Sequence, residues 1–286
     1  MFRIGDELVA LVTDTSCDLS DEQLAAYDIR LVALRLNTSA GEKRDRFELS
    51  QDALYELLKT ETPKTSLPLP QDVSDLYAQL RAEGCTRVLH LTISSGLSGC
   101  NNMVQIIAED VDGLRVDVVD SRTLSAGLGL LVLTAAEALA AGYTVEEAIS
   151  EVERVRVGQL GCFVIRTLDY LRKGGRIGAV EGLLGSLLQI KPVIYVDDNG
   201  VYQTLTKARG FNGALEAMCN ELYRRFDGRS VRLAVVHGNA PEEAEKLLAR
   251  LCERLSVVSS FISPVSPALA IHTGPGLLGA IVQAAD

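Results

Sequence analysis

Short apolar runs alternate with amphipathic segments along the first half of the chain. The predicted strands cover residues 8–13, 29–34, 88–93 and 116–119. The predicted helices cover residues 21–27, 51–60 and 72–83. Nearly continuous apolar strands separated by helices indicate a parallel sheet that is covered on both faces. Such sheets bind ligands beyond the carboxyl ends of their strands, so the loops that follow the strands are candidate sites.

The pattern changes after Gly161. The predicted strands then cover residues 162–167, 193–196, 201–205, 231–236, 257–262 and 269–271. The predicted helices cover residues 182–189, 213–225 and 242–255. Because the Asn199-Gly200 pair favours the turn of an antiparallel hairpin, we expect a mixed sheet in this half.

The length of 286 residues is about twice that of a typical domain. We therefore predict an α/β protein of two domains. Residues 1–157 are expected to form a Rossmann-like domain with a parallel sheet, and residues 158–286 an α/β domain with a mixed sheet. Hydrophobic residues make up 47% of the chain, which is enough apolar material for two cores.

The chain is acidic, with a formal net charge of −10. Repulsion from phosphate groups argues against a nucleic-acid partner, and it limits contact with anionic membranes to transient encounters. Residues 125–141 approach the length of a membrane span, but they contain Glu137 and begin with small residues. We predict that they form a buried helix, since a span needs about 20 apolar residues.

The six cysteines show no C-x-x-C spacing, and none forms a local metal-ligand pair with a histidine. We therefore expect reduced thiols, no metal site and no cofactor. The first residues contain only a short apolar run before Asp14 and no cleavage pattern of a signal peptide. Together these features predict a cytoplasmic protein.

The sharpest local signal is the segment at residues 94–99, with the sequence SSGLSG, between a predicted strand and a predicted helix. The start of a helix offers unpaired N–H groups and partial positive charge, glycines allow close approach, and serines add hydroxyl donors. The segment is therefore a candidate carboxylate or phosphate site. An ordinary capped turn is the alternative.

Four other segments combine hydroxyl, basic or glycine residues. Residues 13–18 follow the first strand, and helix capping is the favoured interpretation there. Thr65 and Ser66 lie among prolines that keep the chain extended. The segment is either a ligand contact or a plain connector. Arg176 and Arg209 adjoin glycines, although each taken singly is typical of solvated surface charge. His272 lies in a glycine-rich turn and is better placed to meet a ligand than His90, which we expect to be structural.

Two motif matches are rejected. The glycines at positions 274, 276 and 279 fit the dinucleotide fingerprint, but too few residues follow them for the required helix, strand and acidic residue. The serine at position 98 resembles a nucleophile elbow, but Cys100 stands where the second glycine belongs.

Taken in order, these segments resemble the DegV family over nearly the whole chain. The matching pieces are T-D-T-S-x-D-L, T-S-x-P, I-S-S-x-L-S-G, V-D-S at 119–121, L-x-K-G-G-R-I at 171–177, I-K-P-V-I at 190–194, K-x-R-G and H-x-G-P-G. The resemblance implies a two-domain α/β fold that holds one long-chain fatty acid between the domains, without a catalytic residue of its own. It also implies a separate ATP-binding fatty-acid kinase subunit, to which the carboxylate is presented and whose acyl-phosphate product stays bound.

The resemblance also implies roles for particular residues. Thr65 and Ser95 would bind the carboxylate. Other residues assigned by position to that head group are Ser66, Ser94, Ser98 and His272. Arg176 and Arg209, together with His272, would form a charged mouth. The chain departs from the family pattern T-S-Q-P-S at Leu67 and Leu69, and Cys100 replaces a usual threonine, which predicts a more apolar mouth.

Burial of about 14 methylenes contributes roughly 11 kcal/mol gross, whereas a hydrogen bond to a carboxylate contributes about 1.5–3 kcal/mol. The tail is therefore expected to dominate affinity, with residues 183–188 and 277–281 as candidate tunnel walls or ordinary core. Two alternatives stay open. One is a serine hydrolase or acyltransferase that uses Ser95 or Ser98 with His272 and either Asp14 or Asp120. The other is an anion-binding module without lipid specificity.

Overall fold

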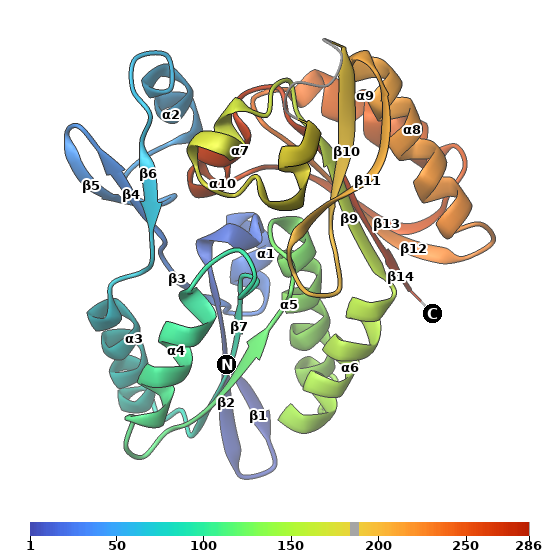
Figure 1. Cartoon of the computed structure of the whole chain (residues 1–286). Coiled ribbons are helices and arrows are strands. Elements are labelled where there is room, and N and C mark those ends of the chain that lie inside the picture. Colours follow the sequence, from blue (N-terminus) through green and yellow to red (C-terminus); the bar gives the residue numbers. More distant parts are fainter. Residues whose placement is uncertain (184–188, 286) are drawn as a thin grey trace.

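The computed structural model describes residues 1–183 and 189–285. The chain folds into two main sheets with helices packed around them, and a small third sheet stands beside their junction (Figure 1). We call the main sheets the N-terminal sheet and the C-terminal sheet. The predicted α/β class is confirmed.

The N-terminal sheet has the strand order β1-β2-β7-β8, and β3 also pairs with β2. Its strands are β1 (Phe2–Ile4), β2 (Glu7–Asp14), β3 (Arg30–Val32), β7 (Arg87–Thr92) and β8 (Arg115–Asp120). All pairs are parallel except β1 with β2. The helical segments of this part are η1 (Thr15–Cys17), α1 (Asp21–Ala26), α3 (Pro70–Ala82), α4 (Cys100–Glu109), α5 (Ala126–Ala140) and α6 (Val145–Val157).

The small sheet was not foreseen in the sequence. It consists of β4 (Arg35–Thr38), β5 (Gly41–Arg44) and β6 (Lys64–Ser66), in the order β5-β4-β6, and α2 (Gln51–Leu57) lies between β5 and β6 in the chain. Its strands are short and polar, so their apolar periodicity is weak. The small sheet matters because β6 carries Thr65 toward the centre of the molecule.

The C-terminal sheet has the order β11-β10-β9-β14-β12-β13, with only β12 and β13 parallel to each other. Its strands are β9 (Gln159–Val164), β10 (Ile190–Val196), β11 (Tyr202–Arg209), β12 (Ser230–His237), β13 (Ser256–Pro264) and β14 (Leu278–Ala284). The helical segments are α7 (Asp169–Lys173), η2 (Gly178–Leu183), α8 (Gly210–Arg225), α9 (Pro241–Cys252) and α10 (Pro267–Thr273). The predicted hairpin is present: β10 and β11 are antiparallel, and Gly200 has a φ of 75° in the turn.

Local signals start several helices. Ser20 and Thr144 each form a capping box, with Gln23 and Glu147 respectively. Proline is the first residue of α3, α9 and α10, where its missing N–H costs nothing.

One expectation for the C-terminal half was wrong, and another falls largely outside the described residues. Residues 269–271 belong to α10 and not to a strand, because Pro267 starts a helix and the short apolar run fits either structure. The last strand is instead β14, whose glycine-rich beginning hid it. Of the helix predicted at 182–189, residues 184–188 lie outside the described part of the chain.

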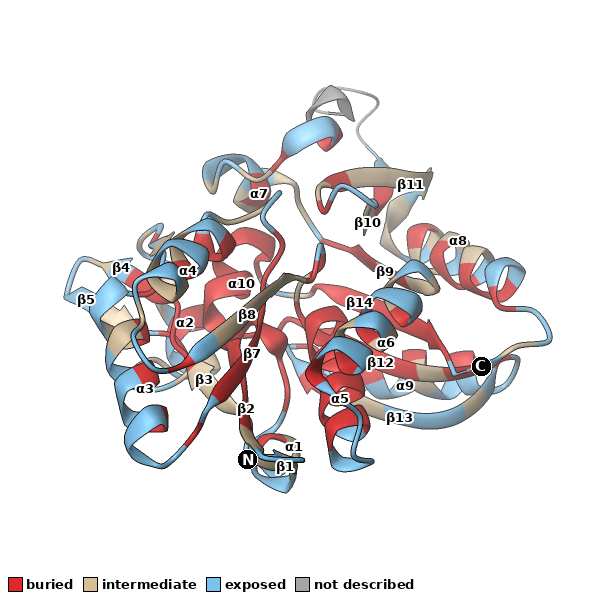
Figure 2. Cartoon of the chain, turned by 90° about the horizontal axis from the view of Figure 1, so that it is seen from below, coloured by how far each residue is buried: buried red, intermediate tan, exposed pale blue. Residues whose placement is uncertain are grey.

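The core continues across the junction of the two main sheets. One buried cluster joins Ile93 and Leu130 from the N-terminal part to Phe163, Leu269 and Ile281 from the C-terminal part. Figure 2 shows α5 as a largely buried helix, as expected for residues 125–141. Within residues 1–183 and 189–285, no helix has both the length and the apolar character to cross a bilayer. The division after residue 157 falls between α6 and β9, and as a domain boundary it stays a prediction.

Candidate functional site

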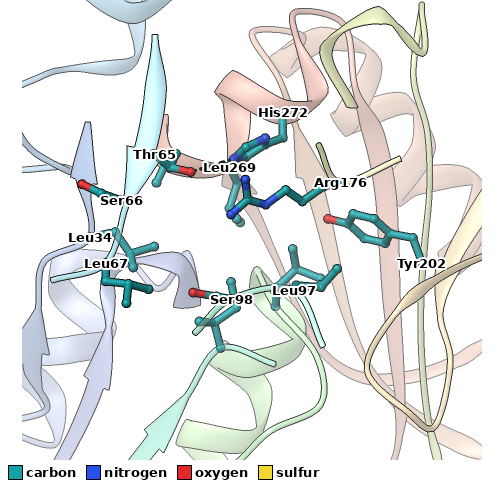
Figure 3. A pocket seen from close by; sticks show the side chains of 13 residues that line it. Leu34, Thr65, Ser66, Leu67, Leu97, Ser98, Arg176, Tyr202, Leu269 and His272 are labelled. Carbon is teal, nitrogen blue, oxygen red and sulfur yellow. Dashed lines mark hydrogen bonds between the residues drawn. The ribbon is translucent and has the colours of Figure 1, made fainter. Parts of the chain in front are cut away.

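A cavity of about 240 Å³ lies where β6, the 94–99 loop, α10, the segment after α7 and β11 meet. We call it the polar cavity. Its polar lining consists of Thr65, Ser66, Ser98, Arg176, Tyr202 and His272 (Figure 3). Its apolar lining consists of Leu34, Leu67, Ile93, Leu97, Leu124, Ala268 and Leu269. Residues from loops that follow strands of the N-terminal sheet, from the small sheet and from the C-terminal half thus face one space.

Thr65 and His272 contact each other across the cavity wall, with Thr65 Oγ1 2.9 Å from His272 Nε2. Burial, together with the nearby charge of Arg176, lowers the pKa of His272 to about 4, so the imidazole is neutral at pH 7. Its Nδ1 is buried and has no hydrogen-bond partner in the described part of the chain, residues 1–183 and 189–285. Because a buried N–H without a partner is costly, we assign the proton to Nε2, which donates to Thr65. The threonine hydroxyl then keeps its own proton for a ligand.

Arg176 brings a positive charge to the cavity. Its Nη1 donates to the carbonyl of Gly174 at 2.7 Å, which fixes the guanidinium on the loop after α7. Gly174 lies against the His272 ring, and a Cβ at this position would overlap Nδ1. The close approach of the His272 ring therefore requires glycine at position 174. The backbone conformation does not, because a φ of −78° is open to any residue.

The two serines of the lining differ. Ser98 Oγ accepts a hydrogen bond from the Cys100 amide at 3.2 Å, so its own proton remains available as a donor. Ser66 Oγ accepts from Asn37 Nδ2 at 3.1 Å, and Figure 3 shows its hydroxyl turned away from His272 and Arg176. Ser98 is thus better placed to serve a ligand.

Three residues assigned to the site by the family pattern do not line the polar cavity. Ser94 is fully buried, and its hydroxyl donates to the carbonyl of Gly200 at 2.7 Å. Ser95 donates its hydroxyl to Asp120 at 2.6 Å and does not line the polar cavity. Arg209 is exposed and donates to Gln189 at 2.6 Å. The first two hydroxyls are committed to protein acceptors, which the sequence could not reveal.

Ser94 belongs to a close contact between the 94–99 loop and the β10–β11 turn. A Cβ on Gly96 would come within 2.7 Å of the Gly200 carbonyl oxygen, and a Cβ on Gly200 would overlap Ser94 Oγ. This contact joins the part of the chain that carries the N-terminal sheet to the hairpin that carries Tyr202.

A second, smaller cavity of about 40 Å³ adjoins the first, and we call it the apolar cavity. The two share Leu124, Tyr202 and Leu269 as walls. Further apolar lining comes from Phe163, Val196, Val236, Val265, Leu277 and Ile281. Of the candidate tunnel walls, residues 277 and 281 line this cavity, whereas residues 184–188 lie outside the described part of the chain.

The acidic residues of the first loops lie at the other end of α10. Asp18 accepts hydrogen bonds from the Ser266 amide (2.8 Å) and the Ser125 hydroxyl (2.5 Å), and Asp45 accepts from the Ala268 amide (3.0 Å). Burial raises the pKa of Asp18 to about 7 and that of Asp45 to about 6. These carboxyl groups fasten the start of α10. The capping interpretation of residues 13–18 holds for Asp14, which caps η1 by accepting from the Ser16 amide, whereas α1 is capped by Ser20.

The catalytic alternative finds little geometric support. A serine nucleophile needs a histidine within hydrogen-bonding distance. The three histidines contact Thr65, the Tyr77 hydroxyl and the Ala240 amide instead. Asp14, one proposed acid, accepts from Ser16 and the Ile93 amide.

The fold and the cavities define a class of protein: an α/β protein with two adjoining cavities, one lined by hydroxyl and basic side chains among apolar ones and the other mainly by apolar side chains. The chain belongs to the DegV family. The model of that family, described as "Uncharacterised protein, DegV family", matches residues 8–285.

Three relatives illustrate the similarity. A DegV domain-containing protein of Clostridium perfringens is 34% identical over 275 residues, which are 96% of this chain and 98% of the relative. A DegV family protein of Thermus thermophilus, whose structure is described as showing fatty acid binding, superposes with a TM-score of 0.91 at 31% identity, covering 96% and 99% of the two chains. A stearic acid-binding protein of Eubacterium ventriosum superposes with a TM-score of 0.89 at 26% identity, covering 97% and 98%.

Proposed function

We propose that this protein binds one long-chain fatty acid, with its carboxylate in the polar cavity and its tail in the apolar cavity. The observation that carries the proposal is that a cavity with hydroxyl and guanidinium donors and a mainly apolar cavity lie side by side and share Leu124, Tyr202 and Leu269 as walls. A polar part followed by an apolar part matches an amphiphile. The relatives described as fatty-acid-binding proteins support the same ligand class.

Thr65, Ser98 and Arg176 are the proposed donors to the carboxylate. Each hydrogen bond to a charged group contributes about 1.5–3 kcal/mol, and tail burial contributes about 0.8 kcal/mol per methylene. The head group therefore sets direction, and the tail sets most of the affinity. Because the apolar cavity holds only about 40 Å³, we infer that its side chains move apart as the tail enters.

The first experiment is organic extraction of the purified protein, followed by mass spectrometry for fatty acids. We expect a near-stoichiometric fatty acid, or stoichiometric uptake of added oleate or palmitate. Absence of both would overturn the proposal. Displacement of a bound ligand by inorganic phosphate but not by oleate would favour the alternative anion-binding module.

We further propose that the bound carboxylate is presented to a separate ATP-dependent kinase subunit. Arg176 lines the polar cavity and is only partly buried, so its guanidinium can bind the phosphate of an acyl phosphate held there. The loaded protein should yield acyl hydroxamate with hydroxylamine only after incubation with ATP, Mg²⁺ and an ATP-binding fatty-acid kinase subunit. Product formation without that subunit would contradict the presenting role.

A further inference from the structure

Tyr202 lies in the wall that the polar and apolar cavities share, although no motif in the sequence singled it out. Its side chain is buried, and its ring packs edge to face against Phe163, with ring centroids 5.4 Å apart and an interplanar angle of 71°. This packing holds the ring and therefore fixes the direction of the hydroxyl group. Figure 3 shows that hydroxyl directed toward Arg176.

The Tyr202 hydroxyl has no hydrogen-bond partner among residues 1–183 and 189–285. Buried tyrosine hydroxyls usually find a partner, because an unpaired polar group costs free energy. Burial also raises the pKa of Tyr202, so the group is a neutral O–H donor at any physiological pH. Among the other buried tyrosines, the hydroxyl of Tyr223 donates to the Arg250 carbonyl at 2.8 Å and that of Tyr77 lies 2.7 Å from His90. The Tyr55 hydroxyl also has no partner among the described residues, but Tyr55 lines neither cavity.

The donors of the polar cavity lie on different sides of it. Thr65 comes from β6, whereas Arg176 and Tyr202 come from the loop after α7 and from β11 (Figure 3). A carboxylate has two oxygens with about four acceptor sites, so it can bind donors from both sides at once. Thr65 and Ser98 can serve one oxygen while Arg176 and Tyr202 serve the other.

We propose that the Tyr202 hydroxyl is a head-group contact, which donates to the ligand carboxylate oxygen that faces Arg176. The inference rests on the proposed function. It places the carboxylate at the border between the two cavities, so the first methylenes of the tail lie against Leu124 and Leu269. It also makes Tyr202 a specificity-determining residue, because it favours a ligand with an acceptor at that position over an equally long hydrocarbon.

The test compares Tyr202→Phe with Tyr195→Phe. Phenylalanine keeps the ring contact with Phe163 and removes only the hydroxyl. Tyr195 is the matched control, because it lies on the neighbouring strand β10 but packs in a different hydrophobic cluster. Binding of oleate and of 1-octadecene, which lacks an acceptor, is measured by partition of radiolabelled ligand.

We expect Tyr202→Phe to weaken oleate binding about 10-fold, to leave 1-octadecene binding unchanged and to resemble wild type in denaturant unfolding. Equal oleate affinity in wild type and variant, or an equal loss for both ligands, would overturn the inference while the proposed function stands. If the wild-type protein takes up no fatty acid at all, the proposed function fails, and this inference fails with it.

A second measurement does not depend on affinity. Oleate labelled with ¹³C at the carboxyl carbon reports the pKa of the bound carboxylate by NMR titration. Loss of a donor to the charged form raises that pKa, by about one unit for a 10-fold effect. We expect this rise in Tyr202→Phe and no change in Tyr195→Phe; an unchanged pKa in both variants would overturn the assignment.

Discussion

The two ends of α10 carry polar clusters of opposite character. At its start, Asp18 and Asp45 accept hydrogen bonds from the backbone amides of Ser266 and Ala268. At its end, His272 holds Thr65 on one side, and the remaining donors face a cavity. The carboxyl groups of the first cluster accept hydrogen bonds from the protein itself. In the second cluster, hydroxyl and guanidinium donors face the polar cavity.

The difference separates a role in the fold from a role in binding. Both clusters combine hydroxyl and charged residues, and both join the N-terminal part of the chain to α10. The first is buried, whereas Thr65, Ser98 and Arg176 of the second are partly exposed. They differ in what their polar groups meet: the carboxyl groups of the first accept from backbone amides of α10, whereas Thr65, Ser98 and Arg176 of the second line the polar cavity. The following variants should affect the first cluster mainly in stability and the second mainly in ligand binding.

The largest expected effect is that of Asp18→Ala. It leaves the Ser266 amide and the Ser125 hydroxyl without their acceptor, at about 1–3 kcal/mol for each unsatisfied group. We expect the free energy of unfolding in denaturant to fall by about 3 kcal/mol. The exposed residue Asp6 provides the control, with a change below about 0.5 kcal/mol for Asp6→Ala. Equal stability of the two variants would contradict the structural role.

The second prediction concerns pH. Burial raises the pKa of Asp18 from 3.8 to about 7, so the folded state binds a proton that the unfolded state lacks. The associated stability is fully present below pH 3.8 and is lost as the pH rises through about 7. Relative to Asp18→Asn, which does not titrate, wild type should therefore gain about 2 kcal/mol when the pH falls from 8 to 5.

Urea unfolding of both proteins at several pH values measures this difference. The three histidines have lowered pKa values and act in the opposite direction, but they are common to both proteins and cancel. Parallel curves for the two proteins would show that Asp18 does not titrate in this range.

The third variant addresses the open cluster. Thr65→Val removes the hydroxyl that His272 positions, while a side chain of similar shape remains. We expect oleate affinity to fall about 10-fold, which corresponds to one hydrogen bond to a charged group. Calorimetric titration measures the affinity, and an unchanged value would remove Thr65 from the head-group site.

The smallest effect is expected at the mouth of the polar cavity. Leu67 lines this cavity and is 37% exposed, whereas Leu69 is similarly exposed, at 42%, but does not line it. Leu67→Gln should speed fatty-acid release to acceptor vesicles about threefold, because water gains access to the head group. Leu69→Gln is the control. Equal release rates in the two variants would show that the leucine at position 67 does not shield the site.

Much of the fold could be predicted because its signals are local. Apolar strands such as residues 88–93, capping residues and the Asn199-Gly200 turn act over a few positions. The prediction failed for residues 269–271, where a short apolar run fits helix and strand equally. It also missed β4 and β5, whose polar strands are defined by pairing with each other rather than by a buried face.

The site was predictable only as a set of segments. Thr65, Ser98, Arg176 and His272 do line one cavity. Which serine of the 94–99 loop faces it depends on distant acceptors: Asp120 binds Ser95, and the Gly200 carbonyl binds Ser94. Tyr202 gave no signal because an aromatic residue in a strand is usually core, and its unused hydroxyl is visible only in three dimensions.

Gly96 and Gly200 lie 104 positions apart in the sequence, yet neither has room for a side chain. A Cβ on Gly96 would meet the carbonyl of Gly200, and a Cβ on Gly200 would meet Ser94 in the loop of Gly96. The two positions are therefore expected to vary together among homologues, because a Cβ at either one forces the opposite loop to move. The same constraint applies to engineering. A β10–β11 turn taken from a relative will fit this protein only if the 94–99 loop is exchanged with it.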